Sequence, residues 1–314
     1  MSGASTAQRT TATARADEIA AIADFTRGFS VEATRPSADD VAALAAIVAP
    51  GTHVYISAVA HRPLAEIVDA ATRLRQAGLE PVPHLAVRNF ADAQELEAFL
   101  ARLGDEADVH RLLVIAGDRD QPAGDFRRAV EVIDGGILQR HGIRDIGIAG
   151  YPDGHPRIPQ HDLDVALADK TTAAEAVGIG VHIVTQFCFD PHAILAWVRR
   201  LRSFGMEHPV RIGLAGPTSL STLLRFAQRC GVRASAQALA RQTGLMRQLF
   251  AMSSPDPLVR ALAEARAGGL AGEIAPHFFS FGGLARSARW AQAVADRRIE
   301  LQPGEGFRVD PPPG

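Results

Sequence analysis

The stretch Asp145-Ile146-Gly147-Ile148-Ala149-Gly150-Tyr151-Pro152-Asp153-Gly154-His155-Pro156 decides the fold, because it joins an apolar strand to a long helical pattern. Prolines and glycines stiffen and bend the turn, which presents Tyr151 and His155 where the strand ends. Taken alone, the turn also fits a Gly/Pro-rich connection with an incidental histidine. The same order of strand, turn and helix recurs along the chain, and it indicates a parallel sheet with crossover helices.

Eight β-rich runs are expected, and they cover residues 29–33, 52–57, 81–87, 111–116, 144–149, 180–186, 209–215 and 276–281. Helical patterns fall at about 17–26, 38–49, 63–77, 92–103, 124–140, 161–177, 191–204, 218–230 and 283–296. Glycines close several of them, at Gly78, Gly142, Gly178, Gly205 and Gly231. Eight βα units predict an α/β fold, a single (βα)8 TIM-type barrel, with its active site at the C-terminal ends of the strands.

The expected domain organisation places one catalytic barrel at residues 17–302, with an extra N-terminal helix before the first strand. Residues 235–269 are expected to form a helical insertion before the last strand. Residues 1–16 are expected to be a disordered lead-in, and residues 303–314 a disordered Pro-rich tail.

Composition excludes several classes of partner. With 314 residues, 47% hydrophobic residues, 22% charged residues and a net charge of -2, the chain has an ordinary globular composition. The absence of a basic excess argues against binding to nucleic acid or an anionic membrane. No apolar run reaches the roughly 18 residues of a membrane span. Cys188 and Cys230 are expected to be free thiols, and the protein to be cytoplasmic.

Polar side chains interrupt the apolar runs at the C-terminal ends of the strands. They are Glu32, Ser57, His84, Asp118, Tyr151, His155 and Gln186. Glu32 lies among apolar neighbours on its strand, so burial is expected to raise its pKa and prepare it as a general acid. The alternative is a structural ion pair of Glu32 with Arg35 or Arg88.

Other positions carry weaker signals. Gly117-Asp118 permits close approach of a ligand and places a charge against it, but the pair also suits an ordinary turn. His84 could contact a ligand or be a hydrogen-bonded core histidine. The sequence has no Gly-x-Gly-x-x-Gly fingerprint, no Walker loop, no HExxH pattern and no cysteine cluster, so no metal site is expected.

Taken together, these motifs resemble those of the methylenetetrahydrofolate reductase family, a flavin-dependent barrel, over about residues 29–296. The matching stretches are Phe29-Ser30-Val31-Glu32, Pro83-His84-Leu85, Gly117-Asp118, Ala149 to Pro156, and Thr185-Gln186-Phe187-Cys188-Phe189-Asp190. The last two are the most specific. The resemblance implies oxidoreductase activity in one-carbon metabolism, the pathway that supplies methyl groups for methionine biosynthesis.

The resemblance also implies roles for individual residues. Glu32 and Asp118 would be catalytic, with Glu32 as the acid and Asp118 beside the flavin ring. The implied cofactor-binding residues are Ser57, His84, Gly117, Asp118, Tyr151, His155 and Lys170. The implied substrate-binding residues are Gln186, which would contact the pterin, and Leu220, which stands where the family has a phenylalanine.

The implied reaction uses NADH or NADPH to reduce FAD, after which hydride passes to 5,10-methylenetetrahydrofolate to give 5-methyltetrahydrofolate. The acid protonates N10 of the folate as the five-membered ring opens. This assigns a folate as the small-molecule substrate. Direction, choice of nucleotide and a homo-oligomeric state are left open by the sequence.

Several positions depart from the family's pattern. They are Ala33-Thr34-Arg35-Pro36 in place of a double aromatic and double proline, Ala116 in place of arginine, Leu220 in place of phenylalanine, and Ser280-Phe281-Gly282 in place of Thr-Leu-Asn. Lys170 is the one basic residue that stands out after the fifth strand. These changes predict that FAD binding is weakened or lost.

Three alternatives therefore stay open. The enzyme could be an oxidative or flavin-independent variant in one-carbon catabolism or demethylation. A pterin-dependent methyltransferase would give no role to the Tyr151–His155 turn. A non-enzymatic folate carrier or regulator would give no role to Glu32.

Overall fold

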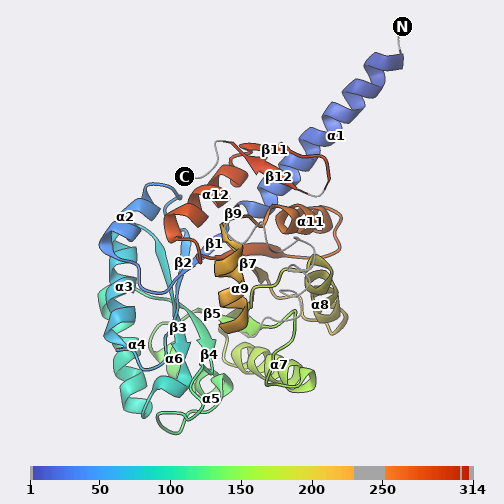
Figure 1. The fold of residues 1–314 in the computed structure, drawn as a ribbon. Helices are drawn as coiled ribbons and strands as arrows, with labels where there is room; N and C mark the ends of the chain where they lie inside the picture. Colours follow the sequence, from blue (N-terminus) through green and yellow to red (C-terminus); the bar gives the residue numbers. More distant parts are fainter. Residues whose placement is uncertain (1–2, 230–251, 305, 311–314) are drawn as a thin grey trace.

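The computed structural model describes residues 3–229, 252–304 and 306–310 (Figure 1). Eight parallel strands close a barrel in the order β1-β10-β7-β6-β5-β4-β3-β2. These strands are β1 (Ser30–Ala33), β2 (His53–Ile56), β3 (Glu80–Ala86), β4 (Arg111–Ile115), β5 (Asp145–Gly150), β6 (Gly180–Thr185), β7 (Val210–Ala215) and β10 (Ile274–Phe279). The predicted TIM-type barrel is confirmed, and each strand begins and ends within two residues of its predicted bounds.

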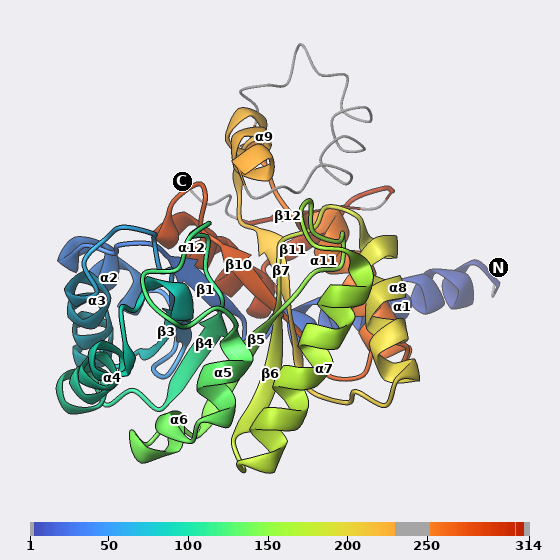
Figure 2. The same ribbon diagram turned by 90° about the horizontal axis from the view of Figure 1, so that it is seen from below.

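Helices cover the outside of the barrel (Figures 1 and 2). They are α1 (Gly3–Thr26), α2 (Ala38–Ala45), α3 (Ala65–Gln76), α4 (Ala93–Ala107), α5 (Ala129–Asp134), α6 (Ile137–Arg140), α7 (Gln160–Ala176), α8 (Pro191–Ser203), α9 (Leu220–Arg229), α11 (Asp256–Ala267) and α12 (Leu284–Ala295), with a 3-10 turn η1 (Val87–Asn89). The helix predicted over 124–140 is two helices, because Gly136 takes a left-handed φ of 67° between them.

Both ends of the described chain differ from the expectation of disorder. α1 begins at Gly3, since residues 4–26 contain neither glycine nor proline and are rich in the strong helix former alanine. Near the C-terminus, β12 (Phe307–Val309) pairs with β11 (Ile299–Leu301), and Phe307 is buried. Of the insertion expected over 235–269, α11 and the short strand β9 (Met252–Ser253) are described, and β9 pairs with β8 (Thr218–Ser219). Residues 230–251, with Cys230 and Gly231, lie outside the described residues.

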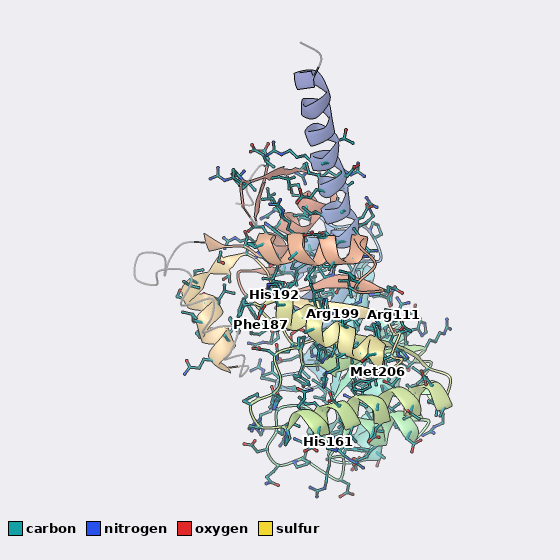
Figure 3. All side chains as sticks on the ribbon, turned by 90° about the vertical axis from the view of Figure 1, so that its right-hand side faces the viewer. Arg111, His161, Phe187, His192, Arg199 and Met206 are labelled. Carbon is teal, nitrogen blue, oxygen red and sulfur yellow. The ribbon has the colours of Figure 1, made fainter. Side chains whose placement is uncertain are left out.

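The barrel has two distinct mouths. α9 stands over the C-terminal ends of the strands (Figure 2). Arg111, which begins β4, and Met206, which precedes β7, lie away from α9, whereas Phe187 and His192, which follow β6, lie toward it (Figure 3). No described helix has the length and apolar character needed to cross a membrane.

Alternate residues of each strand point into the barrel, and this interior is mixed in polarity. Tyr55, Val82, Leu113 and Val184 form an apolar interior cluster. Buried histidines lie in the same barrel, at His84, His182 and His277. A polar interior of this kind can hold a reactive side chain in a fixed position.

Candidate functional site

Glu32 is held by side chains from three other strands. Ser57, just after β2, donates its hydroxyl to Glu32 Oε1 at 2.6 Å. His277 of β10 places Nε2 3.4 Å from Glu32 Oε2, and His84 of β3 places Nε2 3.5 Å from the same oxygen. The Glu32 side chain is 14% exposed. Glu32 therefore lies at the mouth of the barrel within a set of hydrogen-bond donors, which we call the Glu32 cluster (Glu32, Ser57, His84 and His277).

These neighbours reverse the expected acidity of Glu32. Burial alone would raise the pKa of Glu32, but the charge of His84 and the hydrogen bonds and charge of His277 hold it well below its usual range. The expectation of a raised pKa in the free protein is wrong, because it considered only neighbours along β1. The contacts of Glu32 also run to these residues and not to Arg35 or Arg88. Arg88 donates instead to the Arg127 and Arg119 carbonyls.

His277 is the member of the Glu32 cluster that sequence reasoning missed. It is fully buried, and its register opposite Ser30 brings it beside the first strand. Burial lowers the pKa of His277, although Glu32 partly opposes this effect. A histidine in the eighth β-rich run was the available signal, but closure of the barrel is what places that run next to the first.

A second group gathers at the ends of β4 and β5. The rings of Tyr151 and His155 meet edge to face with centroids 5.3 Å apart. Burial raises the pKa of Tyr151, and Asp118 adds to the effect. Burial and Arg157 lower the pKa of His155, while Asp118 opposes them. The structure thus brings together Asp118, Tyr151 and His155, as expected from the two turns, although Asp118 itself is exposed.

The turn that carries Asp118 requires glycine. Gly117 has a φ of 93°, and a Cβ there would lie 2.9 Å from the Ala86 Cβ. Arg119, on the other side of Asp118, has a buried Nε with no hydrogen-bond partner among the described residues. Sequence reasoning missed Arg119 because it noted only the loss of arginine at Ala116.

The remaining predicted residues lie apart from the Glu32 cluster. Lys170 is on α7, where burial lowers its pKa to about 8. Gln186 follows β6 and accepts the Phe187 backbone N–H through Oε1 at 3.1 Å. Leu220 begins α9 and is buried in an apolar cluster with Ala215, so it is part of the core.

An aromatic cluster borders the same mouth, and it was not predicted. Phe281 stacks on Phe226 of α9 with centroids 4.1 Å apart, and it meets Phe187 edge to face at 5.0 Å. Phe279 at the end of β10 contacts both Phe187 and Phe281. The cluster links α9 to the strand ends and gives this mouth an apolar side.

A closed parallel barrel with a carboxylate and histidines at its C-terminal mouth places the protein in the (βα)8-barrel class. Residues 56–263 match the family model described as methylenetetrahydrofolate reductase. The chain therefore belongs to the methylenetetrahydrofolate reductase family. Glu32 and His277 lie outside the matched residues.

Curated relatives agree with this family. The chain is 28% identical over 166 residues to methylenetetrahydrofolate reductase 2 of Saccharomyces cerevisiae, covering 50% of this chain and 27% of that protein. It is 27% identical over 158 residues to 5,10-methylenetetrahydrofolate reductase of Pectobacterium carotovorum, covering 50% of each. The match thus spans half or less of these relatives' lengths. Dihydropteroate synthase of Thermus thermophilus is similar at 16% identity and a TM-score of 0.45, covering 85% of this chain and 92% of that one.

Proposed function

We propose that this protein interconverts 5,10-methylenetetrahydrofolate and 5-methyltetrahydrofolate, with NADH or NADPH as the hydride donor and FAD as the carrier. The observation that carries the proposal is the Glu32 cluster. It fixes a carboxylate at the C-terminal mouth of the barrel, where Asp118, Tyr151 and His155 also gather. Membership in the family supports the choice of substrate.

The residues present fit a flavin. Buried His84 Nε2 has only the 3.5 Å approach to Glu32 Oε2 and makes no shorter hydrogen bond among the described residues, and Gly117 brings bare backbone against Ala86 at the end of β4. Lys170 is the one lysine of the sequence, and it forms no ion pair with a described carboxylate. His84, Tyr151 and His155 would hold the flavin of FAD. Lys170 would bind the diphosphate. When bound, FAD supplies a two-electron carrier.

Glu32 has one defined chemical task in this proposal. In the reductive direction the bond between the methylene carbon and N10 breaks, N10 gains a proton from Glu32, and the carbon gains hydride. Ser57 fixes Oε1 of Glu32 by a 2.6 Å hydrogen bond, and the proton would be exchanged at Oε2, where the contact with His277 is longer, at 3.4 Å. Gln186 would hold the amide edge of the pterin, and Asp118 would stabilise charge beside the ring.

The ionised state of Glu32 favours a second candidate. A carboxylate surrounded by donors is prepared to accept the N10 proton when 5-methyltetrahydrofolate is oxidised and the ring closes. For reduction, Glu32 must gain its proton once folate has displaced water from the mouth. The oxidative direction, in a demethylation or catabolic role, is therefore a physical alternative. Cytoplasmic localisation and a homo-oligomeric state stay predictions.

The test combines an absorption spectrum of the protein with folate turnover assays. The purified full chain is examined for visible flavin absorption and titrated with FAD, and folate turnover is then followed in both directions with each nucleotide, with and without FAD. Turnover that depends on FAD supports the proposal. Turnover that is equal without FAD favours the flavin-independent alternative. No turnover in either direction under any combination overturns the assignment.

A further inference from the structure

His277 links the Glu32 carboxylate to the interior of the barrel. Its Nε2 lies 3.4 Å from Glu32 Oε2, and its Nδ1 lies 2.9 Å from Ser30 Oγ. The ring is fully buried and meets Tyr55 edge to face with centroids 4.6 Å apart. Ser30 and Glu32 are two residues apart on β1, so both side chains point into the barrel. The imidazole, on the neighbouring strand β10, therefore bridges Ser30 and Glu32 of β1.

The donors and acceptors around His277 select one tautomer. Arg211 Nη1 lies 3.3 Å from Ser30 Oγ, and a guanidinium can only donate, so the Ser30 oxygen accepts from Arg211. The Ser30 hydroxyl hydrogen then has His277 Nδ1 as its acceptor. With Nδ1 as acceptor, the proton of neutral His277 is on Nε2, where it faces Glu32. The other tautomer would set a nitrogen lone pair against the carboxylate and leave the Ser30 hydrogen facing Arg211.

The groups around His277 are consistent with a neutral imidazole. It faces Glu32 and Ser30 of β1, Tyr55 of β2, His84 of β3 and Arg211 of β7. Burial lowers the pKa of His277, and the positive charge of Arg211 acts in the same direction. Around Glu32, the facing groups are Ser57, His84 and His277, and each can present a donor.

We propose that His277 is a positioning residue for the acid: fixed as the Nε2–H tautomer by Ser30 and Arg211, it orients Glu32 and keeps its carboxylate ionised until folate binds. His277 would thereby set the pH range in which Glu32 can deliver or accept the N10 proton. The catalytic consequence rests on the proposed function, but the protonation state of Glu32 can be measured without folate.

His182 provides a matched control. It is also a buried histidine in the barrel interior, and its ring also meets Tyr55 edge to face. Its partners are Tyr55 OH at 2.7 Å and Asp145 at 2.9 Å, and it has no contact with Glu32. Replacing either histidine removes a comparable buried ring, but only the His277 substitution removes a donor from Glu32.

The experiment titrates Glu32 directly. Glutamate labelled with 13C in the carboxyl group is incorporated into the full chain, and the Glu32 signal is identified by its loss in Glu32→Gln. We expect Glu32 of the wild type and of His182→Leu to stay ionised at the lowest pH at which the protein is folded. In His277→Leu the proton affinity of Glu32 should rise about tenfold or more. His277→Gln, which can restore a donor, should lie close to the wild type.

Ser30→Ala keeps the ring of His277 and removes only the group that fixes its tautomer, so it serves if His277→Leu does not fold. A smaller rise in Glu32 proton affinity is expected in Ser30→Ala. The same Glu32 titration in His277→Leu or Ser30→Ala as in the wild type, or an equal change in His182→Leu, would overturn the proposal. In folate assays, His277→Leu should retain reduction to higher pH than the wild type. Absence of any folate turnover would count against the proposed function alone, since the titration still decides the role of His277.

Discussion

At the scale of single residues, Glu32 shows how neighbours from other strands determine the chemistry of a carboxylate. The residues that flank it on β1 are apolar and would raise its pKa, whereas Ser57 after β2, His84 of β3 and His277 of β10 stabilise its charge. Each of these neighbours is at least 25 residues away in the chain. The protonation state of Glu32 is therefore a property of the closed barrel.

Glu32→Gln is expected to abolish folate conversion while it preserves the fold. General acid–base catalysis contributes about 10² to 10⁴ in rate, so the folate half-reaction should slow by a factor of that order. Reduction of added FAD by NADH or NADPH should continue at nearly the wild-type rate. Stopped-flow absorbance follows the two half-reactions separately.

Glu80→Gln is the control for this substitution, because Glu80 begins β3 and pairs with Arg75 at 2.6 Å, at the opposite mouth. It should leave both half-reactions unchanged. If Glu32→Gln slowed both half-reactions equally and lowered the melting temperature, Glu32 would be a structural residue.

Gln186→Ala is expected to weaken folate binding more than FAD binding. Removing a buried hydrogen-bonding partner costs about 1 to 3 kcal/mol, which corresponds to a change of about 5- to 150-fold in folate Kd. Because Gln186 Oε1 already accepts the Phe187 N–H, the substitution also releases a backbone donor. Fluorescence titrations with folate and with FAD measure the two affinities. Equal losses for the two ligands would show that Gln186 only supports the loop.

At the scale of elements, β5 shows why a strand inside this barrel needs a glycine. A Cβ at Gly147 would lie 2.9 Å from His182 Nε2 and 3.0 Å from Leu113 Cδ1. The glycine leaves the space in which His182 bonds to Tyr55.

Gly147→Ala should therefore destabilise the protein by about 1 to 3 kcal/mol, the usual cost of overpacking a core. Gly104→Ala is the matched control, since Gly104 lies in α4 with nothing within 4 Å of an added Cβ. There, alanine should stabilise the helix by about 0.5 to 1 kcal/mol. Urea unfolding measures both changes, and a neutral Gly147→Ala would mean that His182 can move without cost.

α7 carries the one lysine of the chain, which makes the proposed contact of Lys170 with FAD directly testable. Burial lowers the pKa of Lys170 to about 8, so a substantial fraction of its amine is neutral and nucleophilic at mildly alkaline pH. Acetic anhydride should modify Lys170, and bound FAD should protect it by pairing its diphosphate with the ammonium group. Peptide mass mapping separates Lys170 from the amino terminus, which is the internal control. Modification of Lys170 at the same rate with saturating FAD would exclude the diphosphate contact.

At the scale of the whole molecule, the N-terminal mouth of the barrel couples stability to pH. His53 lies between Arg111 Nη1 at 2.9 Å and Arg211 Nη2 at 3.0 Å. Burial, Arg211 and Arg111 together lower the pKa of His53 to about 3. Between this value and the ordinary pKa of 6.5, the unfolded chain binds a proton at His53 that the folded chain does not. Folding stability should therefore be complete above pH 6.5 and fall as the pH drops below it.

The free energy of unfolding in urea, measured from pH 8 to pH 4, tests this coupling. Each proton taken up on unfolding contributes a slope of about 1.4 kcal/mol per pH unit. His53→Gln should lower this slope below pH 6.5 and leave the curve above pH 6.5 parallel to that of the wild type. Parallel curves across the whole range would show that His53 does not carry the coupling.

The sequence by itself determined the architecture and part of the site. Alternating apolar runs and helical patterns depend on local chain geometry, so the eight strands, their order and the glycine helix ends at Gly78 and Gly178 could be read directly. The ends of strands are also local features. For that reason Glu32, Tyr151 and His155 could be placed at the C-terminal mouth of the barrel before any contact was known.

Only the tertiary structure decided what these residues can do. Closing the barrel sets β10 beside β1, which brings His277 to Glu32 from 245 residues away and reverses the expected acidity of the carboxylate. The same closure stacks Phe281 on Phe226 and leaves Leu220 in the core. Pattern along the chain reports which face of an element is buried, whereas pKa and hydrogen-bond direction depend on atoms a few ångströms away in space. Those atoms belong to strands that are far apart in the sequence and become neighbours only when the barrel closes.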